Sequence, residues 1–236
     1  MSDGGVRITR RGLIVGAGVG AAVGALGCDP HAPRAGLLGA MDALNERVQQ
    51  RLFRGGRRAR LVRASELTPL DDFPRYHISP SVPAAPAGWQ LAVGGLVRQP
   101  LRLNLDDLKR MPLTEVRVRH HCVEGWTAVA SWQGVAMAEI AARAGADPRA
   151  RFVEFRSFDD GYWSSWDRAS ALHAQTILAY GMNGSPLEPG HGAPLRLYAA
   201  VKLGYKMVKY LTAVSFLPEA TGGYWEDQGY EWFAGV

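Results

Sequence analysis

Residues 115–123 have the sequence Glu115-Val116-Arg117-Val118-Arg119-His120-His121-Cys122-Val123. Since side chains of a β-strand point alternately to its two faces, the alternation predicts a strand with His120 and Cys122 on one face. His121 then points to the opposite face, so the two histidines cannot both bind one metal together with Cys122. A thiolate at a strand end suits a soft transition metal, whereas packing of Cys and His into the core is the alternative.

The composition of the 236-residue chain, 47% hydrophobic and 21% charged, predicts a folded globular protein. The formal net charge is +5, but Arg7, Arg10 and Arg11 lie near the N-terminus, so we expect no nucleic-acid partner. The sequence contains no Cys-x-x-Cys, no phosphate-binding Gly-x-x-x-x-Gly-Lys and no Gly-x-Ser-x-Gly. Zinc-ribbon, iron–sulfur, c-type haem, P-loop and nucleophile-elbow sites are therefore not indicated.

The N-terminus carries an export pattern. Arg10 and Arg11 precede an uncharged run from residue 12 to 27 that is too short and glycine-rich for a comfortable membrane span. The pattern resembles a twin-arginine signal, which predicts a periplasmic protein; an N-terminal anchor helix is the alternative. Cys28 ends the run in Ala25-Leu26-Gly27-Cys28, which resembles a lipoprotein cleavage box and leaves lipid anchoring open.

Cys122 is then the one cysteine expected in the mature fold. Exported proteins normally use cysteines in disulfide pairs, so a single thiol suggests either metal binding or burial as a small apolar residue.

The sequence patterns along the chain predict a signal over residues 1–27, an N-terminal helix and basic linker over 28–65, and one domain over 66–236. Helices are expected at 36–53, 105–111 and 136–144, and strands at 89–97, 115–123, 152–158, 177–180, 195–201 and 208–217. Residues 66–88 hold five prolines and predict a long irregular loop that wraps something. This irregular alternation of helices and strands predicts an α+β fold with a mixed sheet.

Seven arginines occur between Arg47 and Arg63. A solvated helix face and loop is the simplest interpretation, and an anionic partner or membrane surface is the alternative.

Two further segments combine cationic side chains with turns. His191-Gly192-Ala193-Pro194-Leu195-Arg196 precedes a glycine turn and Lys209. Such a set suits a phosphate group, because arginine offers a planar fork and lysine a point charge; surface charge beside a turn is the alternative. Phe73-Pro74-Arg75-Tyr76-His77 places an Arg and a His in the proline-rich loop, which suggests an anion or a heteroaromatic ring.

In order and spacing, these three segments resemble the molybdopterin domain of sulfite-oxidase-like enzymes over residues 66–229, about two thirds of the chain. The resemblance implies an oxidoreductase with a sulfite-oxidase-type fold and a molybdenum–molybdopterin cofactor. It implies Cys122 as the molybdenum ligand. The positions implied for cofactor binding are Phe73, Arg75, Tyr76, His77, Asp159, His191, Arg196, Met207, Val208 and Lys209.

The sequence departs from the sulfite-oxidising branch in two places. Basic residues normally follow the ligand cysteine there, but Val123-Glu124-Gly125-Trp126 follows here, and Tyr76 replaces an Asn. The run is closer to the bacterial periplasmic branch that reduces methionine sulfoxide in proteins. We expect Glu124 on the same strand face as Cys122, where it would repel sulfite and supply protons as a catalytic residue.

The resulting hypothesis is reduction of an oxo substrate such as a sulfoxide, small or protein-bound. Sulfite oxidation and a cofactor-free binding module are the alternatives. Since no internal haem or cluster motif occurs, we expect an electron-transfer partner, either a membrane haem subunit or a soluble cytochrome.

Overall fold

The structure, a computed structural model, describes residues 36–53 and 55–236. The predicted signal over residues 1–27 and the cleavage-box residue Cys28 lie outside the described residues. None of the helices that the structure describes combines the length and the hydropathy that crossing a bilayer requires.

Four α-helices and ten strands are described, joined by short 3₁₀ turns. The helices are α2 (Leu37–Leu52), α3 (Leu105–Lys109), α4 (Met137–Ala144) and α5 (Arg168–Ala171). The strands are β1 (Leu91–Gly95), β2 (Leu101–Leu103), β3 (Leu113–His121), β4 (Thr127–Ala136), β5 (Phe152–Ser157), β6 (Trp163–Asp167), β7 (Thr176–Met182), β8 (Ser185–Pro186), β9 (Arg196–Ala199) and β10 (Leu211–Leu217).

The strands form two sheets. The first has the order β2-β1-β10-β5-β6, in which β1 and β10 are parallel and the other pairs antiparallel. The second has the order β3-β4-β7-β8, with β9 also on β7, and is antiparallel throughout. The predicted α+β fold with a mixed sheet is confirmed, and an antiparallel sheet accompanies it.

Local signals explain where the helices begin and end. Asn104 accepts a hydrogen bond from the Asp107 backbone N–H while Asp107 accepts one from the Asn104 N–H, a reciprocal cap that begins α3. Gly145 adopts φ 62° and ends α4. All three predicted helices are present, each within two residues of its expected ends.

Most strand boundaries differ from expectation by one or more residues, and two of these differences bear on the site. The strand predicted over 208–217 begins at Leu211, because Tyr210 has a left-handed backbone with φ 54° that interrupts extended structure. The strand predicted over 115–123 ends at His121, so Cys122 and Glu124 lie beyond it.

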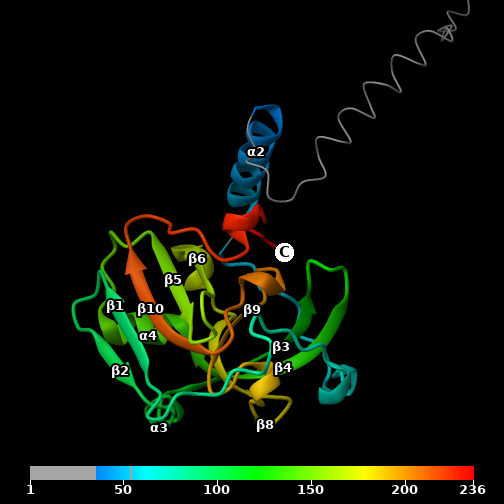
Figure 1. The fold of residues 1–236 in the computed structure, drawn as a ribbon, viewed down its shortest axis with the longest axis vertical. Helices are drawn as coiled ribbons and strands as arrows, with labels where there is room; N and C mark the ends of the chain where they lie inside the picture. Colours follow the sequence, from blue (N-terminus) through cyan, green and yellow to red (C-terminus); the bar gives the residue numbers. More distant parts are fainter. Residues whose placement is uncertain (1–35, 54) are drawn as a thin grey trace, which may run out of the picture.

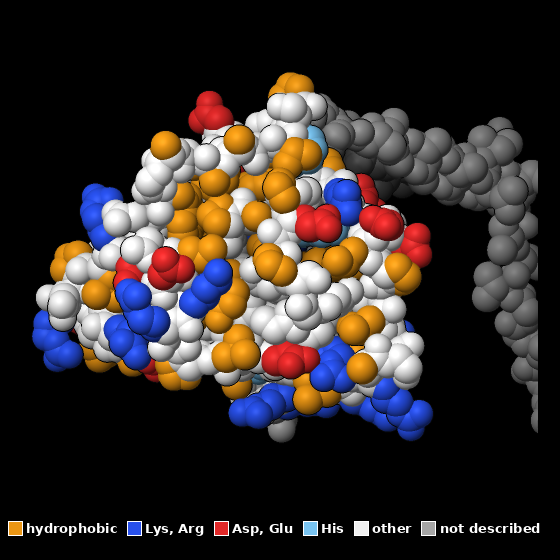
Figure 2. Space-filling view, turned by 90° about the horizontal axis from the view of Figure 1, so that it is seen from below, with side chains coloured by type: hydrophobic (Ala, Val, Ile, Leu, Met, Phe, Trp, Pro, Cys, Tyr) orange, Lys and Arg blue, Asp and Glu red, His pale blue; other side chains and the backbone are white. Residues whose placement is uncertain are grey.

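In Figure 1 the helix α2 projects from the body, with the C-terminal residues at its base. The Gly235 N–H donates to Gln49 Oε1 at 3.3 Å, and the Phe53 and Phe233 rings lie 5.7 Å apart. Figure 2 shows the face turned away from α2, where acidic, basic and hydrophobic side chains are interspersed.

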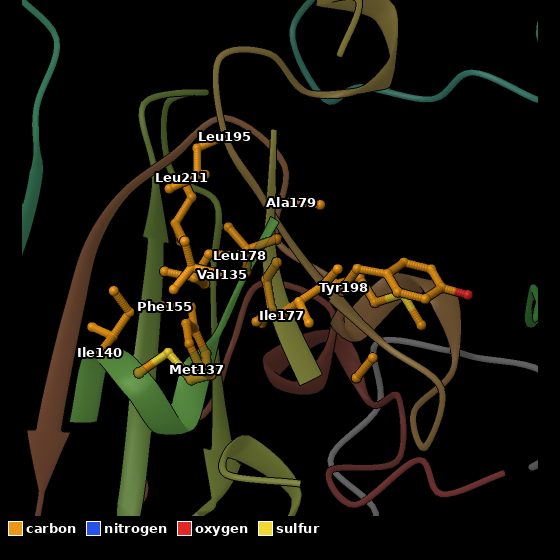
Figure 3. Packing of buried hydrophobic residues seen from close by; sticks show 14 of the residues in the cluster. Val135, Met137, Ile140, Phe155, Ile177, Leu178, Ala179, Leu195, Tyr198 and Leu211 are labelled. Carbon is orange, nitrogen blue, oxygen red and sulfur yellow. The ribbon is translucent and has the colours of Figure 1, made fainter. Parts of the chain in front are cut away.

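The core lies where α4 meets both sheets. Met137 and Ile140 of α4 point toward Phe155 of β5 and toward Ile177 and Leu178 of β7 (Figure 3), and these five side chains are fully buried. Burial of one such side chain contributes about 1.5–3 kcal/mol, so this cluster holds the two sheets in fixed relation. The site described next depends on that relation, because both sheets contribute to it.

Candidate active site

A cavity of about 210 Å³ opens between the ends of the two sheets. Its wall comes from the proline-rich loop, the end of β3, the β5–β6 turn, the start of β9, and the segments 204–210 and 225–230. Nine of the predicted site residues line it: Phe73, Tyr76, His77, Cys122, Glu124, Asp159, Arg196, Met207 and Lys209. Segments more than 100 residues apart in sequence thus meet at one cavity.

Cys122 lies in a turn that follows β3. The Cys122 N–H donates to the Trp126 carbonyl and the Gly125 N–H to the Cys122 carbonyl, both at 3.1 Å. The expectation of a continuous strand through Glu124 is therefore wrong, yet the turn brings Glu124 Oε2 to 3.7 Å from Cys122 Sγ. Burial, assisted by the Glu124 carboxylate and partly offset by backbone N–H groups, raises the pKa of the Cys122 thiol.

Glu124 also accepts a hydrogen bond from Trp126. The indole N–H of Trp126 donates to the same Oε2 atom at 2.9 Å. The exposed carboxylate thus has a fixed position beside the thiol at the cavity wall.

The two histidines before Cys122 face opposite ways, as predicted. His120 is 5% exposed and lines the cavity, whereas His121 is exposed on the other face. Burial, and then the positive charge of Arg196, lowers the pKa of His120 to about 3, which keeps the ring neutral. A side chain at Gly204 would place its Cβ 2.9 Å from His120 Nε2, so the close approach of segment 204–210 requires glycine there.

Arg196 lies at the start of β9 and is 4% exposed. One of its terminal N–H groups donates to the His191 carbonyl at 3.0 Å, and its guanidinium lies 4.6 Å from the centre of the Trp132 ring. No carboxylate of the described residues lies within 4 Å of it. Burial lowers the pKa of Arg196 to about 10, so the charge persists at neutral pH without a partner of opposite sign.

Lys209 lies beside Arg196. Its ammonium donates to the carbonyls of Tyr76 at 2.5 Å and Gly190 at 3.0 Å, and no carboxylate of the described residues pairs with it. Burial and the nearby Arg196 charge lower the pKa of Lys209 to about 7. Gly192 has φ 107°, and any other residue there would place its Cβ 2.9 Å from Lys209 Cβ. Glycine at this position therefore lets Lys209 and Arg196 pack together.

Three predicted site residues stand behind the cavity wall. The Arg75 guanidinium binds the Glu188 carboxylate at 3.0 Å, and Arg75 Nε lies 3.4 Å from His191 Nε2. His191 is 1% exposed, and burial, followed by the charges of Arg196, Lys209 and Arg75, lowers its pKa to about 4. Val208 packs in the hydrophobic core. They support the wall and do not line the cavity.

The proline-rich loop forms one side of the active-site cavity. Phe73 is buried among the rings of His120, Trp126, Trp132 and His191, with centroids 5.6–6.1 Å away. His77 Nδ1 donates to the Ser79 carbonyl at 2.6 Å, since a carbonyl can only accept. The Asp159 carboxylate accepts from the Ser79 hydroxyl and from the Ile78 N–H at 3.1 Å.

Sequence reasoning missed the aromatic edge of the cavity. The rings of Tyr76 and Trp225 lie 6.2 Å apart, Trp225 and Tyr230 5.0 Å, and Tyr230 and Tyr205 5.1 Å. The density of aromatic residues between 224 and 232 was the available signal, but only the fold places it beside Tyr76.

Comparison with known proteins agrees with this architecture. The family model described as "Oxidoreductase molybdopterin binding domain" matches residues 78–225. The chain belongs to this family. It is a molybdopterin-binding oxidoreductase related to proteins named as methionine-sulfoxide reductases.

Two relatives show the range of sequence identity and coverage. The chain is 39% identical over 197 residues to a "putative protein-methionine-sulfoxide reductase subunit YedZ1" of Azospira oryzae, covering 83% of this chain and 75% of the relative. It is 30% identical to the "protein-methionine-sulfoxide reductase catalytic subunit MsrP" of Xanthomonas axonopodis pv. citri, covering 71% of this chain and 58% of that protein. The chain thus spans little more than half of that catalytic subunit.

The fold also matches a solved structure, the sulfane dehydrogenase SoxCD of Paracoccus pantotrophus. The match has a TM-score of 0.60 at 22% identity and covers 66% of this chain and 45% of the other. It confirms the predicted sulfite-oxidase-type fold.

The donor set fits the anionic, hydrogen-bonding cofactor of this family. Arg196 brings a positive charge, and Lys209 brings an ammonium group that a bound anion would keep protonated; no carboxylate of the described residues lies within 4 Å of either. His120 Nδ1 and Tyr210 Oη are buried at the cavity and have no hydrogen-bond partner in the described part of the chain. Buried polar groups normally have partners, so these atoms mark where a bound group would supply them.

Proposed function

We propose that this chain is an exported catalytic subunit that reduces a neutral sulfoxide with a molybdenum–molybdopterin cofactor. The observation that carries the proposal is the Glu124 carboxylate, 3.7 Å from the Cys122 thiol and fixed by Trp126. A negative charge there disfavours an anionic substrate such as sulfite, and the carboxylate can relay a proton from solvent to an oxo group. The names of the relatives support the sulfoxide class.

The cavity residues suggest how the cofactor is held. Arg196 and Lys209 would bind its phosphate, with His77 and the rings of Phe73 and Tyr76 against the pterin, and Cys122 would be the thiolate ligand to molybdenum. Asp159 and Met207 complete the wall, while Arg75, His191 and Val208 support it from behind. When bound, the cofactor supplies two-electron redox chemistry with oxygen-atom transfer.

The reaction balances as a sulfoxide plus two protons and two electrons giving a thioether and water. The sulfur–oxygen bond breaks, sulfur is reduced, and the oxygen leaves as water. The Glu124 carboxylate, whose Oε2 accepts hydrogen bonds from Trp126 and the Cys122 thiol, would take up a proton from solvent and relay it toward the departing oxygen. The two electrons come from an external donor, either a membrane haem subunit or a soluble cytochrome, and the subunit names of the relatives support such a partner.

The proposal is tested by turnover of the purified holoenzyme with a reduced dye as electron donor. We expect reduction of methionine sulfoxide, and little oxidation of sulfite when an oxidised dye accepts electrons. Cys122→Ser should fold and lose more than about a hundredfold of turnover, because even ligand-supporting residues contribute 10–100-fold at metal sites. Efficient sulfite oxidation by the wild type would contradict the proposed substrate class. Purified protein without molybdenum would contradict the proposal that the chain is a molybdenum enzyme.

The role of Glu124 is tested by Glu124→Gln, which keeps the shape and removes the proton donor. We expect sulfoxide turnover to fall about a hundredfold, as for the loss of a general acid, and its pH profile to flatten. Molybdenum content should stay at the wild-type level. An unchanged pH profile would reduce Glu124 to a residue that only orders the turn.

Export rests on Arg10 and Arg11, which lie outside the described residues. A twin-arginine-type signal would deliver the folded chain to the periplasm, and Cys28 is the position at which a lipid anchor would attach.

A further inference from the structure

A second hollow, of about 680 Å³, lies at the base of α2. We call it the arginine groove. Arg57, Arg58, Arg60, Arg63 and Arg119 line it, together with Leu52 and Leu61. No carboxylate of the described residues lies within 4 Å of the first four guanidinium groups, and Arg119 lies 3.4 Å from Glu66. Glu66 also lines the groove and pairs with Arg119, so the other four arginines carry the positive charge that no described carboxylate within 4 Å balances.

The groove is a built surface, because hydrogen bonds fix its backbone to the body. The side chain of Gln175 accepts from the Ala59 N–H at 2.7 Å and donates to the Ala59 carbonyl at 3.0 Å. His173 Nε2 donates to the Arg57 carbonyl at 2.7 Å, and the Val62 N–H donates to the Arg117 carbonyl at 3.1 Å. The arginines are thus presented on a fixed strip of chain, in contrast to the mixed charges of the face in Figure 2.

The groove also has apolar walls. Leu52 is 71% exposed and Leu61 is 62% exposed, and Val62, Ala200 and Val201 also line the groove. A hollow with apolar walls and basic edges fits an inserted acidic segment of a protein better than the flat array of headgroups on a bilayer.

Its position relates it to the active site. His121 and Arg119 line the groove, while His120, between them in sequence, lines the active-site cavity on the other face of β3. His121 is joined by one peptide bond to Cys122. A partner in the groove would therefore stand across a single strand from the proposed metal ligand.

We infer that the arginine groove is the docking site for an acidic, partly apolar segment of the protein that exchanges electrons with the active site. The inference rests on the proposed function for the electron exchange, but the docking itself can be measured separately. Positive charge at such a surface speeds association and fixes orientation, and its effect weakens with salt.

The binding experiment uses the holoenzyme and a labelled decaglutamate peptide, followed by fluorescence anisotropy at low and high salt. The test variant is Arg57→Glu/Arg58→Glu/Arg60→Glu. The control, Arg98→Glu/Arg102→Glu/Lys109→Glu, changes net charge equally at exposed residues around β2 and α3, far from α2 (Figure 1). We expect affinity to fall about tenfold or more in the test variant and less than about twofold in the control. Equal losses of affinity in both variants, or no loss in either, overturn the proposal that the groove is a docking site.

The electron-exchange part uses turnover with two donors: a small dye and an acidic c-type cytochrome. Dye-supported turnover should match the wild type in both variants, while turnover with the acidic cytochrome should fall only in the test variant. An equal fall in both variants overturns a role in electron exchange. If wild-type enzyme shows no dye-supported turnover, the proposed function fails, and decaglutamate binding still decides the docking site.

Sedimentation with phosphatidylglycerol vesicles distinguishes a membrane from a protein partner. If the test variant loses vesicle binding but keeps decaglutamate binding, the protein partner is overturned in favour of a lipid surface. Vesicle binding that is equal in the test and control variants supports the protein partner.

Discussion

Two pairs of cations lie close together in the chain and face opposite electrostatic surroundings. Lys202 and Lys206 are 1% and 0% exposed, and each meets a carboxylate: Asp167 at 3.3 Å and Glu226, respectively. Arg196 and Lys209 meet backbone carbonyls and an aromatic ring, and no carboxylate of the described residues is within 4 Å.

The difference separates structural charge from charge held for a ligand. Moving a charge out of water costs several kcal/mol, so a buried cation normally has a counterion. Lys202 and Lys206 have theirs within the chain. Arg196 and Lys209 have no such counterion among the described residues. Under the proposed function, an anionic cofactor would supply it and recover the energy that the fold gives up there. The absence of a counterion within 4 Å among the described residues is therefore what supports the proposal that the cofactor phosphate binds at Arg196 and Lys209.

Breaking the buried ion pair between Lys206 and Glu226 should have the largest effect on stability. Lys206→Met leaves the Glu226 carboxylate buried without its partner, and we expect the free energy of unfolding to fall by about 3–5 kcal/mol. The measurement is urea unfolding of the cofactor-free protein. Replacing both partners, as Lys206→Met/Glu226→Leu, should restore most of the loss; a double variant as unstable as the single one would contradict this account.

Removing Arg196, which has no counterion within 4 Å among the described residues, should affect cofactor binding much more than stability. Arg196→Met takes away a buried charge that has no counterion, so stability of the cofactor-free protein should change by less than about 1 kcal/mol or increase. Molybdenum content after purification should fall clearly, because truncating one partner of a buried, hydrogen-bonded charge pair costs about 2–5 kcal/mol of binding free energy. Wild-type molybdenum content in Arg196→Met would count against the phosphate site.

A smaller effect should appear in the pH dependence of stability. The pKa of Lys209 is about 7 in the folded chain against an ordinary 10.5. Between those values the unfolded chain binds more protons than the folded one, so stability of the cofactor-free protein should rise with pH across that window. Lys209→Met should reduce this slope, measured as Tm from about pH 7.5 to about pH 9.5, while Lys109→Met at an exposed position should not. In the holoprotein the slope should shrink, because a bound anion favours the charged lysine.

How much the sequence could predict depended on whether a pattern was visible along the chain. Strand β3 was found because Val116 and Val118 alternate with charged residues. Strand β4, the longest, was missed because residues 128–132 are buried on both faces and show no alternation. Glu124 was placed beside Cys122 for the wrong reason: a turn closed by Gly125, not strand periodicity, brings the carboxylate to the sulfur.

By itself the sequence determined the class of fold, the family resemblance and most residues around the cavity, because these depend on residue types and spacing along the chain. It could not decide which cation has which role. Lys206 and Lys209 lie three positions apart in a short irregular segment, where no periodicity says which way a side chain points. Only the packing of segment 204–210 against both sheets turns Lys206 toward Glu226 and Lys209 toward Arg196 and the cavity. The roles follow from which charges the tertiary structure brings within reach, since Coulomb interactions depend on distance in space and on local burial.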